Sequence, residues 1–118
     1  DQRKIRLNGI DCPEKAQAFG QQAKAFTSKN AFQKNVTVIS QGHDRYKRTI
    51  GEVILPNGES LNNLILENGY GWWYQQYSKD QHKHSLEIGA RHSKIGLWSQ
   101  DAANAPWDFR SAKLRHKS

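Results

Sequence analysis

The stretch IRLNGIDCPE, residues 5–14, sets the interpretation of the whole chain. Apolar and polar residues alternate loosely from Lys4 to Ile10, which predicts a β-strand there. Gly9, inside this run, favours a bulge or a close approach of another backbone segment. Pro13 cannot donate a hydrogen bond to a neighbouring strand, so the chain should leave the sheet near this residue. We therefore expect a strand that runs directly into a turn.

The predicted turn carries several groups capable of chemistry. Asp11 and Glu14 are hard oxygen donors of the kind that calcium or magnesium prefers, although two acids in a turn are also typical of a solvated surface. Arg6 precedes them on the strand and needs a partner, either a nearby acid in a structural ion pair or a bound anion. Cys12 is the one cysteine of the chain, which excludes an internal disulfide.

The remaining patterns predict a small fold of mixed type. Three helices are expected, over 16–32, 62–70 and 80–95, with Asn62 as the N-cap of the second. Strands are expected over 35–40 and on both sides of a turn at 57–58. The basic end, 109–118, is expected to be frayed. This order favours an α+β fold, or a small barrel with helices on one side.

The length and charge of the chain limit its domain number and the kinds of molecule that it could bind. The 118 residues suggest one domain, and no apolar run is long enough to span a membrane. The net charge is +7 with a pI of about 9.7, which favours a polyanion such as nucleic acid, or serves solubility alone. His82 and His84, two residues apart on a predicted helix, are interpreted as solvated and not as metal ligands.

A second cluster, HDRYKR at 43–48, places three cationic side chains around Tyr46. Alone, such a run is typical of a solvated turn. Together with the acids of the first turn, it supplies what phosphodiester hydrolysis requires. Arginines and a hard metal ion neutralise charge that develops on phosphate oxygens, and a carboxylate can accept a proton from the attacking water.

Four motifs occur in order across nearly the whole chain and make the pattern specific. They are RLNGIDCPE at 6–14, DRYKRTIGEV at 44–53, NGESLNNLILENGYGWWYQQYS at 57–78 and GLW at 96–98. The set resembles the staphylococcal nuclease family. The resemblance implies an OB-fold-like five-stranded β-barrel with three helices, over residues 1–110, followed by a basic tail, 111–118. It also implies a calcium-dependent endonuclease that acts on DNA and RNA and cleaves the 5′ P–O bond to leave 3′-phosphates.

The resemblance assigns a role to each residue of the matching motifs. Arg6 would contact the scissile phosphate, and Arg48 would stabilise the transition state and the leaving group. Asp11 and the backbone carbonyl of Cys12 would bind calcium. Glu14 would act as the general base and would contact the metal through water.

Nucleotide binding is implied at further positions. Arg45 and Tyr46 match the family's phosphate contacts. Tyr77 and Gln75 stand where the family has tyrosines that line the groove, and the glutamine departs from that pattern. The aromatic residues 72–74 are interpreted as core.

Two departures bear on activity. Lys47 replaces the usual glycine of the turn, and if that position has a positive φ it strains the turn by roughly 1 kcal/mol. The family has an acidic strand pair before the arginine strand, which supplies another calcium ligand, and the sequence from Asp1 onward does not contain it. Either the sequence is trimmed, or the protein lacks this ligand and a piece of the barrel. The alternative is therefore a catalytically impaired module that binds nucleic acid.

The remaining expectations concern assembly and location. We expect a monomer, or a dimer made by strand exchange or edge pairing if the upstream strands are truly absent. A secreted or periplasmic bacterial protein is expected, with a cytoplasmic location as the alternative.

Overall fold

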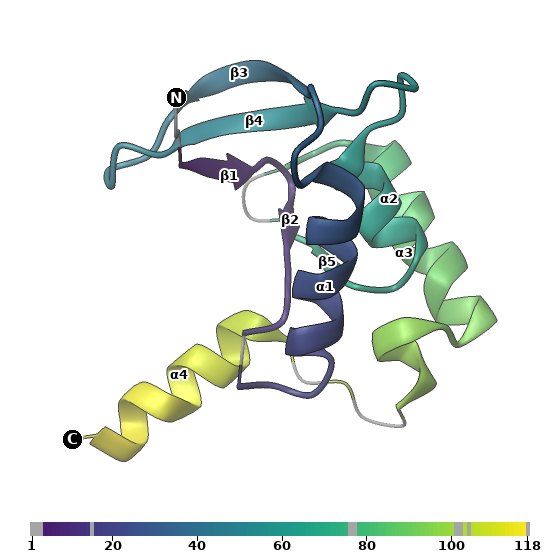
Figure 1. The fold of residues 1–118 in the computed structure, drawn as a ribbon. Coiled ribbons are helices and arrows are strands. Elements are labelled where there is room, and N and C mark those ends of the chain that lie inside the picture. The colour runs from purple at the N-terminus through teal and green to yellow at the C-terminus, as the bar shows by residue number, and fades with distance from the viewer. Residues whose placement is uncertain (1–3, 15, 76–77, 101–102, 104, 118) are drawn as a thin grey trace.

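The computed structural model describes residues 4–14, 16–75, 78–100, 103 and 105–117, and its main sheet has three strands (Figure 1). Strand β4 lies in the middle, pairs in parallel with β1 and pairs antiparallel with β3. The three strands are β1 (Ile5–Leu7), β3 (Thr37–His43) and β4 (Thr49–Ile54). The parallel pairing places Arg6 beside the middle strand, at Ile50.

A second, two-stranded sheet carries the first acid. It pairs β2 (Ile10–Asp11) antiparallel with β5 (Trp72–Trp73). The expected single strand from Lys4 to Ile10 is therefore wrong, because the chain turns at Gly9, which has a φ of +78°. The α+β class is confirmed. The described residues place their strands in two sheets and do not show a closed five-stranded barrel.

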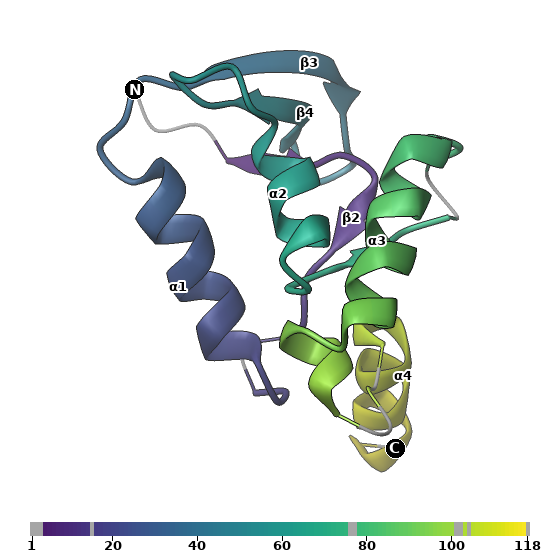
Figure 2. The ribbon, with the colours of Figure 1, turned by 90° about the vertical axis from the view of Figure 1, so that its right-hand side faces the viewer.

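Helices α1, α2 and α3 lie on the same side of the three-stranded sheet (Figure 2). They correspond to the three helices expected from the sequence. A short 3₁₀ turn, η1, and a fourth α-helix, α4, follow them. The bounds are α1 (Gly20–Ala31), α2 (Leu61–Glu67), α3 (Gln81–Ser93), η1 (Gly96–Ser99) and α4 (Pro106–Lys117). None of the described helices is long and apolar enough to cross a membrane.

The basic end of the chain is helical, so the expectation that it frays is wrong. Pro106 occupies the first position of α4, where its missing N–H is no loss, and Asp108 lies in the first turn, where its charge suits the helix dipole. The helix crosses the expected boundary between residues 110 and 111. Its far end projects away from the rest of the molecule in Figure 1.

Asn62 is not the N-cap of α2. Ser60 takes that place, with its hydroxyl accepting from the N–H of Asn63. Asn62 lies inside the helix and is completely buried. Its side chain accepts from the N–H of Val53 at 3.2 Å, and it donates to the carbonyls of Asn8 at 3.0 Å and Gly51 at 3.1 Å. This amide therefore joins α2 to β4 and to the turn between β1 and β2.

Two apolar clusters hold the elements together. The larger lies among β2, β4 and α2, and consists of Ile10, Val53, Leu55, Leu61, Ile65 and Leu66. The smaller consists of Trp72, Leu97 and Ala105, with Trp98 and Trp107 packed against it. The prediction of core packing is thus confirmed for Trp72, whereas Trp73 and Tyr74 are half-buried. His84 is not simply solvated, because its ring stacks on Trp73 with 4.3 Å between centroids.

Candidate active site

A cleft of about 900 Å³ opens beside β1 and β2, and side chains from distant parts of the chain line it. Most of the predicted site residues lie on its wall: Arg6, Asp11, Cys12, Glu14, Arg45, Tyr46 and Arg48. Gln75 is exposed in the turn after β5 and is not among the described residues that line the cleft. Tyr77 lies outside the described residues. The local motifs therefore converge in space, apart from the groove position at Gln75.

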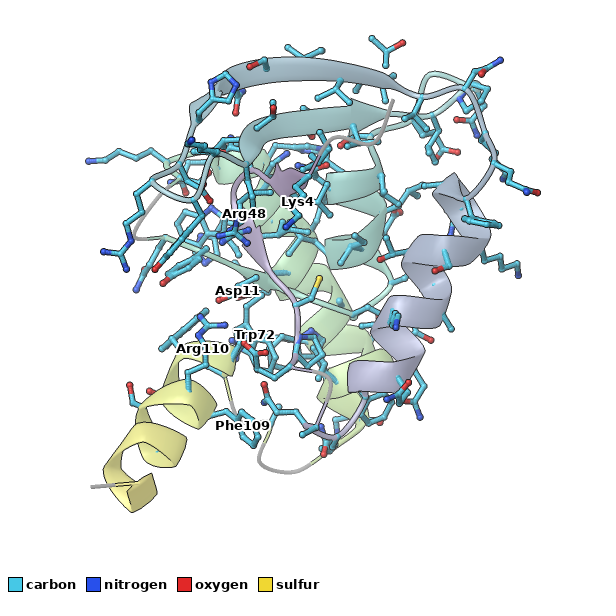
Figure 3. The ribbon with its side chains drawn as sticks, turned by 60° about the vertical axis from the view of Figure 1, so that its left-hand side comes forward. Lys4, Asp11, Arg48, Trp72, Phe109 and Arg110 are labelled. Atoms are coloured by element: carbon cyan, nitrogen blue, oxygen red, sulfur yellow. The ribbon has the colours of Figure 1, made fainter. Side chains whose placement is uncertain are left out.

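The two acids face the same cation, Arg110 of α4 (Figure 3). Its Nη2 donates to Oδ2 of Asp11 at 2.7 Å, and its Nη1 donates to Oε1 of Glu14 at 2.6 Å. The hydrogen bond to Asp11 is the largest cause of a raised pKa at Arg110; partial burial opposes the rise, and Glu14 adds to it. The guanidinium thus stays charged between the carboxylates.

The backbone after β2 sets the direction of these acids. Asp11 is the last residue of β2 and is buried. The N–H of Glu14 donates to Oε1 of Gln17 at 2.8 Å, and the N–H of Gln17 donates to the carbonyl of Glu14 at 2.8 Å. These reciprocal bonds close the turn, so that a short segment presents both carboxylates to the same cleft.

Arg6 is held against the turn between β1 and β2. Its Nη1 donates to the carbonyls of Leu7 and Ile10, each at 2.8 Å, and its guanidinium lies 5.8 Å from the ring centroid of Tyr74. All these partners are neutral. They fix the orientation of Arg6 without neutralising its charge, which leaves a cation on the wall of the cleft that can attract an anion.

Hydrogen bonds to Asp44 fix the turn at 44–48. Its Oδ1 accepts from the N–H groups of Tyr46 and Arg48, each at 2.9 Å, and its Oδ2 accepts from Nε of Arg48 at 2.6 Å. Desolvation alone would raise the pKa of Asp44, but the hydrogen bonds from Arg48 and Tyr46 outweigh it and lower that pKa. The expected positive φ at Lys47 is present, at +64°, and Arg48 nevertheless lines the cleft.

Tyr46 forms an exposed aromatic face between two arginines. Its ring centroid lies 4.8 Å from the guanidinium carbon of Arg45 and 5.6 Å from that of Arg48, and the side chain is 62% exposed. A neighbouring cleft of about 680 Å³ shares these three residues and Arg6. Cations and an open ring together suit the phosphate and base of a nucleotide.

The thiol of Cys12 takes no part in this chemistry. Burial, and then the charge of Asp11, raise its pKa to about 12, against an opposing effect of Arg6. A thiol with this pKa stays protonated at neutral pH and is a poor nucleophile. This agrees with the expectation that only the backbone carbonyl of Cys12 has a functional role.

Apart from the residues of α4, the residues that line the cleft lie within a region that matches a known family. The family model described as "Staphylococcal nuclease homologue" matches residues 4–100. This chain belongs to the staphylococcal nuclease family. The resemblance found in the sequence motifs is therefore confirmed.

Several relatives of this nuclease-family chain carry descriptive names. An "Uncharacterized endonuclease" of Haemophilus influenzae is 38% identical over 107 residues, which are 91% of this chain and 60% of that protein. A "Micrococcal nuclease" of Shigella flexneri is 35% identical, over 92% of this chain and 68% of that protein. "Staphylococcal-like nuclease CAN1" of Arabidopsis thaliana is 33% identical, over 93% of this chain and 34% of that protein. The chain thus spans between a third and about two thirds of these relatives.

Three residues of this family member line the cleft although the sequence did not indicate them: Tyr74, Trp107 and Arg110. The rings of Tyr74 and Trp107 stack with 5.1 Å between centroids and 17° between planes. Trp107 also meets Trp72 edge-on at 6.2 Å. A proline followed by an acid, at 106 and 108, is a helix-start signal that could have predicted α4.

The donors at the cleft fit calcium in chemical type. Among the described side chains there is no group of three or more His, Cys, Asp and Glu that could hold a metal ion. Asp11, Glu14 and the carbonyl of Cys12 nevertheless offer hard oxygen atoms, and water would complete the six to eight ligands that calcium usually takes. The position of Arg110 shows that the space between the two carboxylates accepts a cationic group.

Proposed function

We propose that this chain is the catalytic domain of a calcium-dependent endonuclease that hydrolyses phosphodiester bonds in DNA and RNA. The observation that carries the proposal is the convergence of two arginines, Arg6 and Arg48, with two acids, Asp11 and Glu14, on one cleft. The acids come from the end of β2 and the segment directly after it, whereas the arginines come from β1 and from the turn before β4. Membership of the nuclease family and the names of the relatives support the same activity.

In the proposed mechanism, each side chain acts on one part of the reaction. Arg6 and Arg48 bind the phosphate and stabilise the charge that grows on its oxygens. Glu14 accepts a proton from the attacking water. Asp11 and the carbonyl of Cys12 hold calcium, which when bound neutralises negative charge at the phosphate. The 5′ P–O bond breaks and the product keeps a 3′-phosphate.

The proposal extends to substrate binding and to the protein's setting. Arg45 and Tyr46 bind a neighbouring nucleotide, and Gln75 and Tyr77 are proposed as further nucleotide contacts because they stand where the family has tyrosines that line the groove. A monomer with an OB-fold-like barrel, secreted or periplasmic, belongs to the same proposal because the family implies it.

A second candidate is a module that binds nucleic acid without cutting it. The contacts of Arg110 favour it, because they engage both carboxylates that the reaction needs. The cationic wall formed by Arg6, Arg45 and Arg48 would still attract a polyanion.

A calcium titration of nuclease activity on plasmid DNA and on RNA separates the two candidates. We expect hydrolysis that requires calcium and stops with chelator. Glu14→Gln keeps the shape of the side chain but removes the base, so the rate should fall by about 10² or more. Glu67→Gln, at an exposed position of α2, is the matched control and should leave the rate unchanged.

Two results would contradict the proposal: no calcium-dependent hydrolysis by the wild type, or full activity in Glu14→Gln. Binding of single-stranded DNA without cleavage would favour the module instead.

A further inference from the structure

Arg110 bonds both acids on which the proposed mechanism depends. Its two terminal nitrogens bond one oxygen each of Asp11, the proposed calcium ligand, and Glu14, the proposed general base. The guanidinium therefore serves as the counter-ion of the acidic pair in the structure. Arg110 is separated from Glu14 by 96 positions and from Asp11 by 99. The contact therefore depends on the tertiary fold and not on the local turn.

A divalent cation and the guanidinium of Arg110 would repel each other if both were bound to Asp11 and Glu14. Calcium binds carboxylate oxygens at about 2.3–2.6 Å, so it would lie within a few ångströms of the fixed charge on Arg110. Like charges at such distances repel strongly in a partly buried site. Binding the metal should therefore require the guanidinium to leave at least one of its two carboxylates.

We propose that Arg110 is a latch that closes the acidic pair, and that binding of a divalent cation opens it. The latch regulates the site of the proposed function and rests on that function. In the closed form, Arg110 holds Asp11 and Glu14 together and offsets half of their negative charge, and these acids are protected from binding metal at low concentration.

The attachment of α4 suits such a latch. Pro106 is fully buried and Trp107 packs on Trp72 and Tyr74, so the first turn of the helix is anchored to the body. Arg110 lies one turn further, and its side chain is 41% exposed. Solvent weakens ion pairs of this exposure, so they can open without unfolding the helix. The anchor then keeps the released side chain beside the cleft.

The affinity for calcium tests the latch directly. Calcium chloride is titrated by calorimetry into the wild-type chain and into Arg110→Ala. Removal of the competing charge should tighten binding by about tenfold or more. Arg110→Lys keeps the charge but cannot make the two parallel bonds, so its affinity should lie between the two. Lys29→Ala removes an equal charge from an exposed position of α1 and should bind calcium like the wild type.

A second measurement needs no variant. In the wild type, the guanidinium NMR signals of Arg110 should shift when calcium is added. Those of Arg91, which pairs with Glu87 and stacks on Trp98 outside the cleft, should stay in place. If Arg110→Ala does not fold, this measurement decides alone.

Equal or weaker calcium binding by Arg110→Ala would overturn the latch, because Arg110 would then hold the acids in place for the metal. Unmoved Arg110 signals at saturating calcium, or no calcium binding by any of the proteins, would overturn it as well. The readout is affinity and not cleavage, so the two proposals fail separately. A chain that cuts nucleic acid with unchanged affinity in the variant keeps the function and loses the latch. A chain that cuts nothing but binds calcium more tightly without Arg110 keeps the latch.

Discussion

At the scale of single residues, the buried amide of Asn62 shows how much one side chain can connect. It bonds two carbonyls and one N–H group in the turn between β1 and β2 and in β4. We expect Asn62→Ala to lower the free energy of unfolding by about 3 kcal/mol, because these buried groups would lose their partner. Urea denaturation measures the change.

Asn30→Ala is the matched control for this substitution. The side chain of Asn30 bonds only the carbonyl of Phe26 in its own helix among the described contacts. Alanine has a higher helix propensity than asparagine, so the change should stay within about 0.5 kcal/mol. Equal losses in the two variants would contradict the role given to Asn62.

The same residue explains one limit of sequence reasoning. An asparagine before an apolar run satisfies the rules for an N-cap, and so does Ser60 two positions earlier. The choice depends on tertiary bonds that no local pattern contains. Arg6, Asp11 and Glu14 could be brought together in advance because a single short motif carries all three.

Arg110, in contrast, could not be assigned to the site from any local motif. Its partners lie almost the whole chain away, and it stands near the start of a polar, basic run with no clear apolar stripe. Helix α4 takes its position from the packing of Trp107 on Trp72 and Tyr74, which could not be derived from the run itself.

At the scale of elements, two glycines let the ends of α2 and α3 touch. Gly69 has a φ of +78°, and a Cβ there would lie 2.4 Å from the carbonyl oxygen of Ile95. A Cβ on Gly96 would meet the carbonyl oxygen of Gly69 at 2.4 Å, and the N–H of Leu97 donates to that oxygen at 2.8 Å. The junction can therefore form only without side chains at these two positions.

Gly69→Ala should lower the free energy of unfolding by about 2 kcal/mol or more, because it adds both a clash and an unfavourable φ. Gly89→Ala provides the contrast, since Gly89 is exposed in the middle of α3 and a Cβ there meets nothing within 4 Å. That variant should gain about 0.5–1 kcal/mol from helix propensity. Thermal unfolding compares the two, and a stabilised Gly69→Ala would show that the junction tolerates a side chain.

Helices with clear apolar spacing could be predicted from the sequence, but their ends could not. The first helix begins at Gly20 and not near residue 16, because Phe19 before it adopts a left-handed φ of +67°. The helix over 80–95 was predicted well, since Asp80 is a favourable N-cap, and it does accept from the N–H groups of His82 and Lys83. The expected single strand over 4–10 is divided into β1 and β2 because Gly9 turns the chain between them.

At the scale of the whole molecule, the net charge of +7 should govern binding to nucleic acid. If Arg6, Arg45 and Arg48 each neutralise one phosphate, the affinity for single-stranded DNA should fall with salt with a log–log slope of about −2. Arg45→Ala should reduce the magnitude of the slope by about 0.7. Fluorescence anisotropy in the presence of chelator, which prevents cleavage, measures both slopes.

Lys29→Ala is again the control for net charge, because Lys29 is exposed on α1 and does not line the cleft. Its slope should match that of the wild type. An equal reduction in both variants would mean that binding follows total charge and not the cationic wall of the cleft.

The parallel pairing of β1 with β4 determines how much of this protein must be synthesised before its cleft can form. Ile5 leaves the ribosome before Thr49, its partner in the sheet. Asp11 can pair with Trp72 only after residue 72 has been synthesised, and both acids can bond Arg110 only after residue 110 has been synthesised. Pairings this distant in sequence form late in folding, since the chain between them must first be ordered. The acids are thus synthesised before the segments that position them, and a growing chain carries no assembled cleft until α4 has emerged.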